Sequence, residues 1–526
     1  MDQNVVLGVI VLLLFGIGAA IMITRTFPAI LVLPILGVSI AVAAAVSSGR
    51  ITFEDITSGV IGQGALKLAP AIIISFFGGM ISFVMQKSGV AHSLVKNGAE
   101  LIGDNPLAVS LFSMGLVALL FTSIGGLGAV IMVSLIVLPM LATVGVQPVV
   151  AGGIMLFGLS AGGMMNAGPW VTLSQSLNIP VEQVRDYSVV MFVLTALAGI
   201  FFVCVELYRG NTMRNIVPLA ATAGSSAIAG VAFIWVFLRH GGEAVAGKVA
   251  EIPPGWKELY FITAAPAGTS PVMVIARLIT EALLALLVLL IFVDIYKRIP
   301  RWRHQVVEIR WYSYLIPIVP LALILIFHMD PLAAFVFGFV YSILSTARPG
   351  SVSLTIQSMI QGSATVLPAM MLMVGIGILL TAIMGPATFA AHGGTDWPVI
   401  SALRPIISIV TPDTPLKYVI YFTIFAPLAL YRGPLNSYGL GFGFAQVLIG
   451  TGILSNLSVM GVLQSAGQIQ GICDPTNTQN VWLANELRVD VQALLWRTIP
   501  YVWVAAFVGL AIASQLYPIP ALGYGR

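Results

Sequence analysis

Ser160-Ala-Gly-Gly-Met-Met-Asn-Ala-Gly-Pro-Trp170 is a short polar, glycine-rich break inside an otherwise hydrophobic segment of the chain. A second break, Ser465-Ala-Gly-Gln-Ile-Gln-Gly-Ile-Cys-Asp-Pro-Thr-Asn-Thr-Gln479, lies at the corresponding place in the second half. Inside a bilayer, backbone without helical hydrogen bonds is tolerated only where protein buries it or where it lines a cavity. Two such interruptions in matching positions are the best sequence indication of a binding site in a transport protein.

The composition is that of a protein that crosses a membrane many times. Of the 526 residues, 58% are hydrophobic and only 8% are charged, whereas about a quarter of the residues of a soluble domain are charged. The net charge of +4 does not indicate nucleic-acid binding, because the basic residues lie in short loops that orient the chain in the membrane. The N-terminus lacks a basic region, so we interpret residues 4–24 as a retained first span.

Hydrophobic runs of about 20 residues, the length that crosses the hydrocarbon core, predict an all-α fold with about 12 spans. Two of these spans are expected to be broken at the polar stretches, 148–177 and 457–483. The other expected spans are 4–24, 28–47, 66–86, 187–207, 216–238, 272–296, 314–330, 332–347, 366–384 and 497–517.

Residues 105–145 and 416–455 are expected to form re-entrant hairpins, which enter and leave the membrane on the same side. Each has two hydrophobic arms and a polar tip that contains glycine, at 122–126 and at 431–437. The alternative is that each segment forms one or two ordinary spans. The basic loop 297–310 is expected to face the cytoplasm, and the positions of the other basic loops agree with this orientation when both hairpins are re-entrant.

The two halves carry an internal repeat. The dipeptide Gln-Gly at residues 63–64 recurs at 361–362, about 298 residues later. An odd number of crossings separates equivalent points, so the two copies are expected to have opposite orientations, as inverted repeats do. The sequence therefore divides into a first inverted repeat over residues 1–210, linking spans and loops over 211–310, and a second inverted repeat over 311–526.

A family resemblance is carried by Asn166-Ala-Gly-Pro169 in the first break and Asp474-Pro-Thr-Asn477 in the second. With its paired hairpins, the chain resembles the ion transporter superfamily of secondary carriers, which includes gluconate, citrate and C4-dicarboxylate permeases and sodium-coupled dicarboxylate carriers. The Ser-Asn-Thr signature of the sodium-coupled branch is absent from both tips, which favours the gluconate and citrate branch. The resemblance implies a moving unit of hairpins and broken helices on a scaffold of the remaining spans that forms a homodimer.

Arg432 lies at the expected tip of the second hairpin. A charge near the centre of a bilayer costs at least about 2.5–3.5 kcal/mol on insertion scales, so it usually faces a partner or a wet cavity. A guanidinium offers a planar fork that matches a carboxylate. We therefore predict that Arg432 holds a carboxylate of the substrate. The alternatives are a structural pair with Asp474 and an arginine that extends to the outer surface.

Asp474 is the only carboxylate in either break. Burial disfavours its charged form, whereas a nearby arginine favours it. An anionic substrate that competes for Arg432 would therefore change the proton affinity of Asp474, which predicts a coupling site for protons, or for sodium. The alternative is that Asp474 caps the half-helix that follows it.

Oxygen- and amide-bearing side chains at the breaks and tips are expected to contact the substrate, together with one aromatic residue. These candidates are Thr122, Ser123, Asn166, Trp170, Thr172, Asn436, Ser437, Thr476, Asn477 and Thr478. The free N–H groups and positive dipole ends of half-helices favour an anion nearby. The alternatives are that the polar side chains satisfy the broken backbone and that Trp170 packs as an ordinary aromatic residue.

The sequence has no His/Cys/Asp cluster with metal-ligand spacing and no Walker-type phosphate loop. We therefore expect no enzyme activity, no catalytic residue, no metal and no cofactor. The expected function is secondary active transport of small organic anions, carboxylates or hydroxy acids, by an elevator-type mechanism in a bacterial inner membrane, with protons favoured over sodium for coupling. The alternatives are a sodium/proton antiporter of the same architecture and a permease subunit of a larger transport complex.

Overall fold

The computed structural model describes residues 3–24, 26–245, 271–298, 309–327, 329–348, 350–391, 393 and 396–517. All regular structure in these ranges is helical, which confirms the predicted fold class. Seven of the described helices are long and apolar enough to cross a membrane. Most of the basic loop 297–310 lies outside the described residues.

The first half of the chain contains three long helices, a hairpin, a bent pair and one long closing helix. Its elements are α1 (Gln3–Ile23), α2 (Ala29–Ser48), η1 (Asp55–Gln63), α3 (Gly64–Leu66), α4 (Ala69–Ser88), α5 (Val90–Ile102), α6 (Pro106–Phe121), α7 (Leu127–Thr143), α8 (Pro148–Met164), α9 (Ala167–Leu177) and α10 (Val181–Arg209). The linking helices α11 (Ile216–Val245) and α12 (Pro271–Arg298) follow.

The second half repeats this order with shorter pieces at its start and in its hairpin. Its elements are η3 (Trp311–Leu315), α13 (Val319–Phe327), α14 (Pro331–Ser345), α15 (Ser351–Gln357), η4 (Ser358–Gly362), α16 (Ser363–Met384), α17 (Ala387–Ala391), α18 (Pro398–Ile407), α19 (Pro415–Phe425), η5 (Ala426–Arg432), α20 (Gly441–Gly450), α21 (Asn456–Cys473), α22 (Thr478–Glu486) and α23 (Val491–Leu516).

The segment 314–330 differs from its prediction as one simple span. It forms the end of η3, a turn and the nine-residue helix α13. Nine helical residues extend about 14 Å, less than half of a hydrocarbon core about 30 Å thick. Pro317 and Pro320 explain the interruption, because a proline cannot donate the backbone hydrogen bond that a continuous helix needs there.

Polar caps fix where several helices begin. Asn105, Asp330 and Thr414 precede α6, α14 and α19, and each side chain accepts a hydrogen bond from a backbone N–H of the first turn. A proline follows each of these caps, at a position where the helix needs no N–H donor. A cap of this kind stabilises a helix by about 1 kcal/mol, so these positions define the helix boundaries locally.

Both predicted broken helices are interrupted at the polar stretches. The axes of α8 and α9 meet at 57° around Met165 and Asn166. Residues 474–477 separate α21 from α22. The two breaks lie within the quoted sequence motifs, so the glycine, asparagine and proline signals located them correctly.

The arms of the two predicted hairpins are short. In the first, α6 has 16 residues and α7 has 17, and they contact each other. In the second, α19 has 11 residues and continues directly into the seven-residue η5, whereas α20 has only 10 residues, which corresponds to about 15 Å. A return arm of this length does not cross a bilayer about 30 Å thick, and this supports the prediction of a re-entrant segment in the second half.

Two glycine pairs hold the helices before the hairpins in close contact. Gly64 packs against Gly377, and a Cβ atom on Gly377 would overlap the carbonyl oxygen of Gly64. Gly79 packs against Gly362, where Cβ atoms on the two glycines would lie 2.5 and 2.8 Å from the carbonyl oxygen of the other. Both pairs join the two halves, and the internal repeat relates Gly64 to Gly362 and Gly79 to Gly377.

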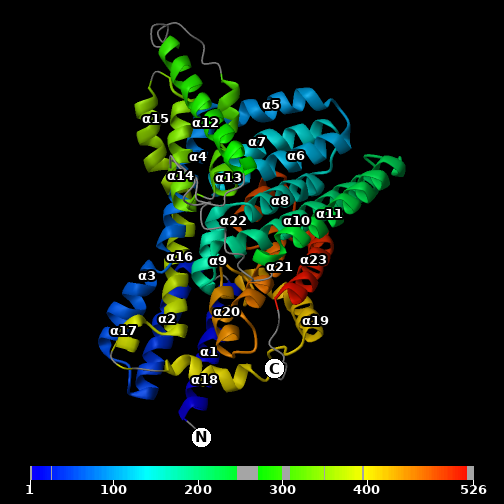
Figure 1. Cartoon of the computed structure of the whole chain (residues 1–526). Coiled ribbons are helices and arrows are strands. Elements are labelled where there is room, and N and C mark those ends of the chain that lie inside the picture. The colour runs from blue at the N-terminus through cyan, green and yellow to red at the C-terminus, as the bar shows by residue number, and fades with distance from the viewer. Residues whose placement is uncertain are drawn as a thin grey trace.

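Contacts between the halves are reciprocal elsewhere too. The second hairpin arm of each half touches the second part of the other half's broken helix, as α7 touches α22 and α20 touches α9. In Figure 1, α2, α3 and α15 to α17 lie on the left side, and α5 to α8, α10, α11, α21 and α23 gather on the right. Both parts of the first broken helix, α8 and α9, contact α21 of the second, so the two broken helices pack against each other.

Candidate functional site

Asp474 is a fully buried carboxylate that joins the second break to the second hairpin tip. Its Oδ1 accepts hydrogen bonds from the backbone N–H of Tyr431 at 3.1 Å, and from the N–H and hydroxyl of Thr476 at 2.9 and 2.7 Å. Its Oδ2 accepts one from Nδ2 of Asn436 at 3.0 Å. Asp474 is 0% exposed, so these four neutral donors replace the water that a carboxylate otherwise needs.

The tip of the second hairpin has an unusual backbone. Tyr431 and Arg432 have φ angles of 55° and 61°, in the left-handed region that non-glycine residues rarely occupy. Two consecutive residues of this kind are strained and persist only where surrounding contacts hold them. Here the N–H of Tyr431 bonds to Asp474, and its hydroxyl accepts a hydrogen bond from Nε2 of Gln492 at 3.1 Å.

Arg432 is half-buried beside this carboxylate and keeps most of its donors free. Its Nη1 donates to the carbonyl of Tyr438 at 2.9 Å. Within the described part of the chain, no carboxylate lies within ion-pair distance of its guanidinium, and no other hydrogen-bond partner contacts it. The structure therefore brings Arg432 and Asp474 to one site without pairing them directly, because neutral groups already occupy the carboxylate.

The remaining candidates at the second break lie in three different environments. Asn477 is buried, and its side chain donates to the carbonyl of Gln470 at 2.5 Å. The backbone N–H of Ser437 donates to Oε1 of Gln470 at 2.8 Å. Thr478 is exposed at the start of α22. Thus Ser437 and Asn477 both contact Gln470, whereas Thr478 is exposed.

The first break is joined to the first hairpin by a similar set of hydrogen bonds that involves no charged group. Asn166 caps α9 by accepting from the N–H of Gly168 at 3.0 Å, and its Nδ2 donates to the carbonyl of Phe121 at the end of α6 at 3.1 Å. One asparagine therefore joins the first break to the first hairpin, as Asp474 joins the second break to the second hairpin.

The other candidates of the first half are engaged with backbone carbonyls. Trp170 is 1% exposed and its ring N–H donates to Met164 at 2.6 Å. The hydroxyl of Thr172 bonds to Gly168 at 2.8 Å. The hydroxyls of Thr122 and Ser123 bond to Pro317 at 3.1 and 2.6 Å. In this conformation these groups satisfy main-chain acceptors, so their contact with a substrate stays a prediction.

A buried polar ladder joins the two broken helices to α10. Oε1 of Gln468 accepts from the hydroxyls of Ser160 and Thr195, both at 2.9 Å. One turn earlier on α21, Oε1 of Gln464 accepts from the hydroxyl of Ser188 at 3.1 Å. Interhelical hydrogen bonds of this kind contribute about 0.6–2 kcal/mol each in membranes. The ladder therefore holds α8, α10 and α21 together.

Sequence reasoning missed Tyr431, Gln470 and Gln492 as parts of the site. The donor that Tyr431 supplies to Asp474 is a backbone N–H, which carries no side-chain signal. Gln470 lies inside the quoted second motif, and its position among apolar residues of α21 was the available signal. Gln492 reaches Tyr431 from α23, and this contact depends on tertiary packing alone. No group of three or more metal-ligating side chains occurs in the described ranges.

Comparison with known proteins gives weak similarities only. No family model matches the chain, and no curated relative matches it. It is similar to the solved structure of the YdaH transporter of Alcanivorax borkumensis, with 14% identity, a TM-score of 0.40, and coverage of 88% of this chain and 89% of that chain. It is also similar to MtrF of Neisseria gonorrhoeae, with 12% identity, a TM-score of 0.41, and coverage of 92% of this chain and 95% of that chain. At these levels neither protein's activity is transferred to this chain.

Proposed function

We propose that the chain is a secondary active transporter of small organic anions, carboxylates or hydroxy acids, with protons as the coupling ion. The observation that carries the proposal is the half-buried guanidinium of Arg432, which has one described partner, the carbonyl of Tyr438. Such a charge in a membrane protein is costly unless a counter-charge or water compensates it. A substrate carboxylate would supply that counter-charge.

The surroundings of Arg432 favour an anion with a polar body. The hydroxyl of Ser437 lies on the same tip, and Thr478 begins a half-helix whose N-terminal N–H groups favour negative charge. A guanidinium can bind a carboxylate through two parallel hydrogen bonds. We assign Arg432 as the clamp for the anion, with Ser437 and Thr478 as contacts for its hydroxyl or second carboxylate oxygens.

The hydrogen bonds that Asp474 accepts from Tyr431, Asn436 and Thr476, here called the clasp, suggest how a proton could be coupled to movement of the hairpin. All four of its described hydrogen bonds use the carboxylate as an acceptor. A proton on either oxygen turns that position into a donor, which conflicts with the N–H of Tyr431 or the amide of Asn436. Protonation would thus release the tip that carries Arg432, and deprotonation would restore the clasp.

We propose that the hairpins, broken helices, α10 and α23 form the moving unit, and that the helices crossing at the glycine pairs form the scaffold. The polar ladder supports the first part, because its hydrogen bonds lie within that unit. The reciprocal glycine contacts support an origin of the scaffold from two inverted copies. The homodimer and the bacterial inner membrane remain predictions from the sequence.

Replacing Arg432 by Gln is expected to lower carboxylate affinity by more than about 100-fold, since a charge-assisted hydrogen bond contributes about 1.5–3 kcal/mol and a fork makes two. The matched control is Arg404→Gln, because Arg404 also donates to one backbone carbonyl, that of Gly450. The affinities of both variants are measured by ligand-induced thermal shifts of the purified protein with mono-, di- and tricarboxylates, with and without sodium. Unchanged affinity in folded Arg432→Gln protein would defeat the clamp assignment.

The alternatives give distinct outcomes. A sodium/proton antiporter built around Asp474 would exchange the two cations in proteoliposomes with no organic acid present. A permease subunit would transport nothing until its partner protein is added. Carboxylate movement by the purified chain alone would exclude the permease subunit, and absence of sodium/proton exchange would exclude the antiporter.

A further inference from the structure

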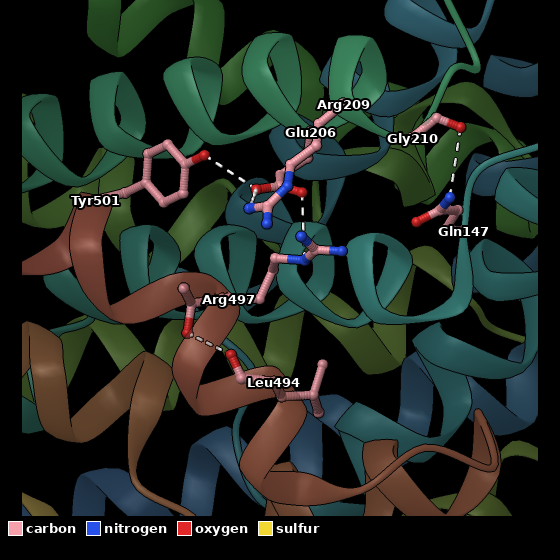
Figure 2. Close-up of polar contacts among 8 residues, drawn as sticks. Gln147, Glu206, Arg209, Gly210, Leu494, Arg497 and Tyr501 are labelled. Atoms are coloured by element: carbon pink, nitrogen blue, oxygen red, sulfur yellow. Dashed lines mark hydrogen bonds and ion pairs between the residues drawn. The ribbon is translucent and has the colours of Figure 1, made fainter.

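A second buried carboxylate, Glu206, lies near the C-terminal end of α10. Glu206 has a side chain that is 1% exposed, and it sits between two guanidinium groups (Figure 2). Nη1 of Arg209 lies 3.8 Å from its Oε1, and Nε of Arg497 lies 3.3 Å from its Oε2. The hydroxyl of Tyr501 donates to Oε1 at 3.1 Å. The cluster joins α10 of the first half to α23 of the second.

The charges in this cluster do not balance. Among the described residues, Glu206 is the only carboxylate within 4.0 Å of either guanidinium, so two positive charges face one negative charge. The side chain of Arg209 is 66% exposed and that of Arg497 is 26% exposed. Each arginine contacts Glu206 through one nitrogen, and its other N–H groups can donate to a ligand. The excess positive charge therefore faces outward.

The exposed neighbours of these arginines are of the residue types found at the edge of the hydrocarbon region. Tyr208 and Trp496, which precede the two arginines in sequence, are 50% and 70% exposed. Tyrosine and tryptophan are enriched at membrane–water interfaces, where one end of the ring is apolar and the other is wet. Val205, one turn before Arg209, and Val504, about two turns after Arg497, are 45% and 63% exposed and suit contact with acyl chains. These exposures are typical of residues at the level of the lipid headgroups.

We propose that Arg209 and Arg497 bind the phosphate headgroup of an anionic phospholipid. A guanidinium fork matches two phosphate oxygens, and basic pockets between membrane helices bind anionic headgroups. Glu206 holds both arginines at the junction of α10 and α23. The two guanidinium groups are therefore in place before a headgroup binds. The acyl chains would follow the exposed apolar sides of the two helices. The lipid would then bridge the first and second halves of the chain.

The test is lipid binding by the purified full-length protein in detergent, measured by native mass spectrometry with phosphatidylglycerol or phosphatidylcholine of the same acyl chains. We expect a preference for phosphatidylglycerol that Arg209→Gln lowers about fivefold, the effect of one basic side chain near an anionic headgroup. The matched control is Lys96→Gln, because Lys96 is 64% exposed and lies 4.0 Å from Glu100. This control should leave the preference unchanged.

A second variant separates lipid binding from a structural ion pair. Glu206→Gln keeps the shape and removes the negative charge, so we expect tighter binding of phosphatidylglycerol than in the unmodified protein. Equal binding of the two lipids, or no effect of Arg209→Gln and Glu206→Gln in folded protein, would overturn the proposal. Displacement of the lipid by excess inorganic phosphate would also overturn it, because it would indicate a site for a free anion.

Discussion

Replacing Asp474 by Asn is expected to reduce carboxylate uptake about 10–100-fold. The new NH2 group of asparagine can take the place of either carboxylate oxygen. In place of Oδ1 it would face the donors of Tyr431 and Thr476, and in place of Oδ2 it would face the amide of Asn436. Either orientation leaves at least one buried donor without its acceptor, at a cost of about 1–3 kcal/mol. Initial uptake rates in proteoliposomes measure the effect on transport, and hydrogen exchange of backbone amides at 431–440 measures the release of the tip.

The matched control for this variant is Asp413→Asn. Asp413 lies just before the same hairpin, but its side chain is 42% exposed and pairs with Lys417 at 2.7 Å. An exposed pair of this kind contributes about 0–1 kcal/mol, so uptake should stay near the unmodified rate. If Asp474→Asn also left uptake and hydrogen exchange unchanged, the carboxylate would have no role in holding or releasing the hairpin.

Replacing Gly377 by Ala is expected to destabilise the scaffold by about 1–3 kcal/mol, the usual cost of adding a group to a packed core. The new methyl group would overlap the carbonyl oxygen of Gly64, which is backbone and cannot rotate away. Thermal unfolding in detergent measures the change. Because Gly362→Ala would place a Cβ 2.8 Å from the carbonyl oxygen of Gly79, it should have an effect of the same sign.

Gly115 provides the control for the glycine pairs. It lies in α6, and a Cβ atom added to it meets no atom within 4 Å. Alanine there is expected to leave stability unchanged or raise it by up to about 1 kcal/mol, because alanine favours the helix over glycine. Equal unfolding temperatures for Gly115→Ala and Gly377→Ala would show that the crossing tolerates a wider separation of the helices.

Local signals located the two breaks well. Asn166 caps α9, and α21 ends at Asp474 and Pro475, where the sequence motifs place the breaks, because caps and prolines act on the nearest few residues. The prediction of one span over 314–330 was wrong, because it rested on the hydrophobicity of the whole segment and gave too little weight to the local signal of Pro317 and Pro320. A hydrophobic run predicts burial in lipid, but its prolines decide whether it stays one helix.

The contacts within the site were less predictable than its position. Sequence reasoning paired Arg432 with Asp474 as candidates, and the structure places them at one site. It did not indicate that a backbone N–H of Tyr431 and the amide of Asn436 occupy the carboxylate. Such contacts depend on how the chain turns at φ angles of 55° and 61°. They also depend on α23, which approaches from about 60 residues further along the chain.

The most direct test of the proposed function is carboxylate flux through proteoliposomes that contain only this purified chain. With an inward proton gradient, we predict accumulation of a labelled organic anion above its equilibrium level, and its collapse when a protonophore is added. Arg432→Gln should abolish the accumulation, and Arg404→Gln should leave it intact. Sodium/proton exchange in the absence of any organic acid, or no movement of the anion under any gradient, would contradict the proposal.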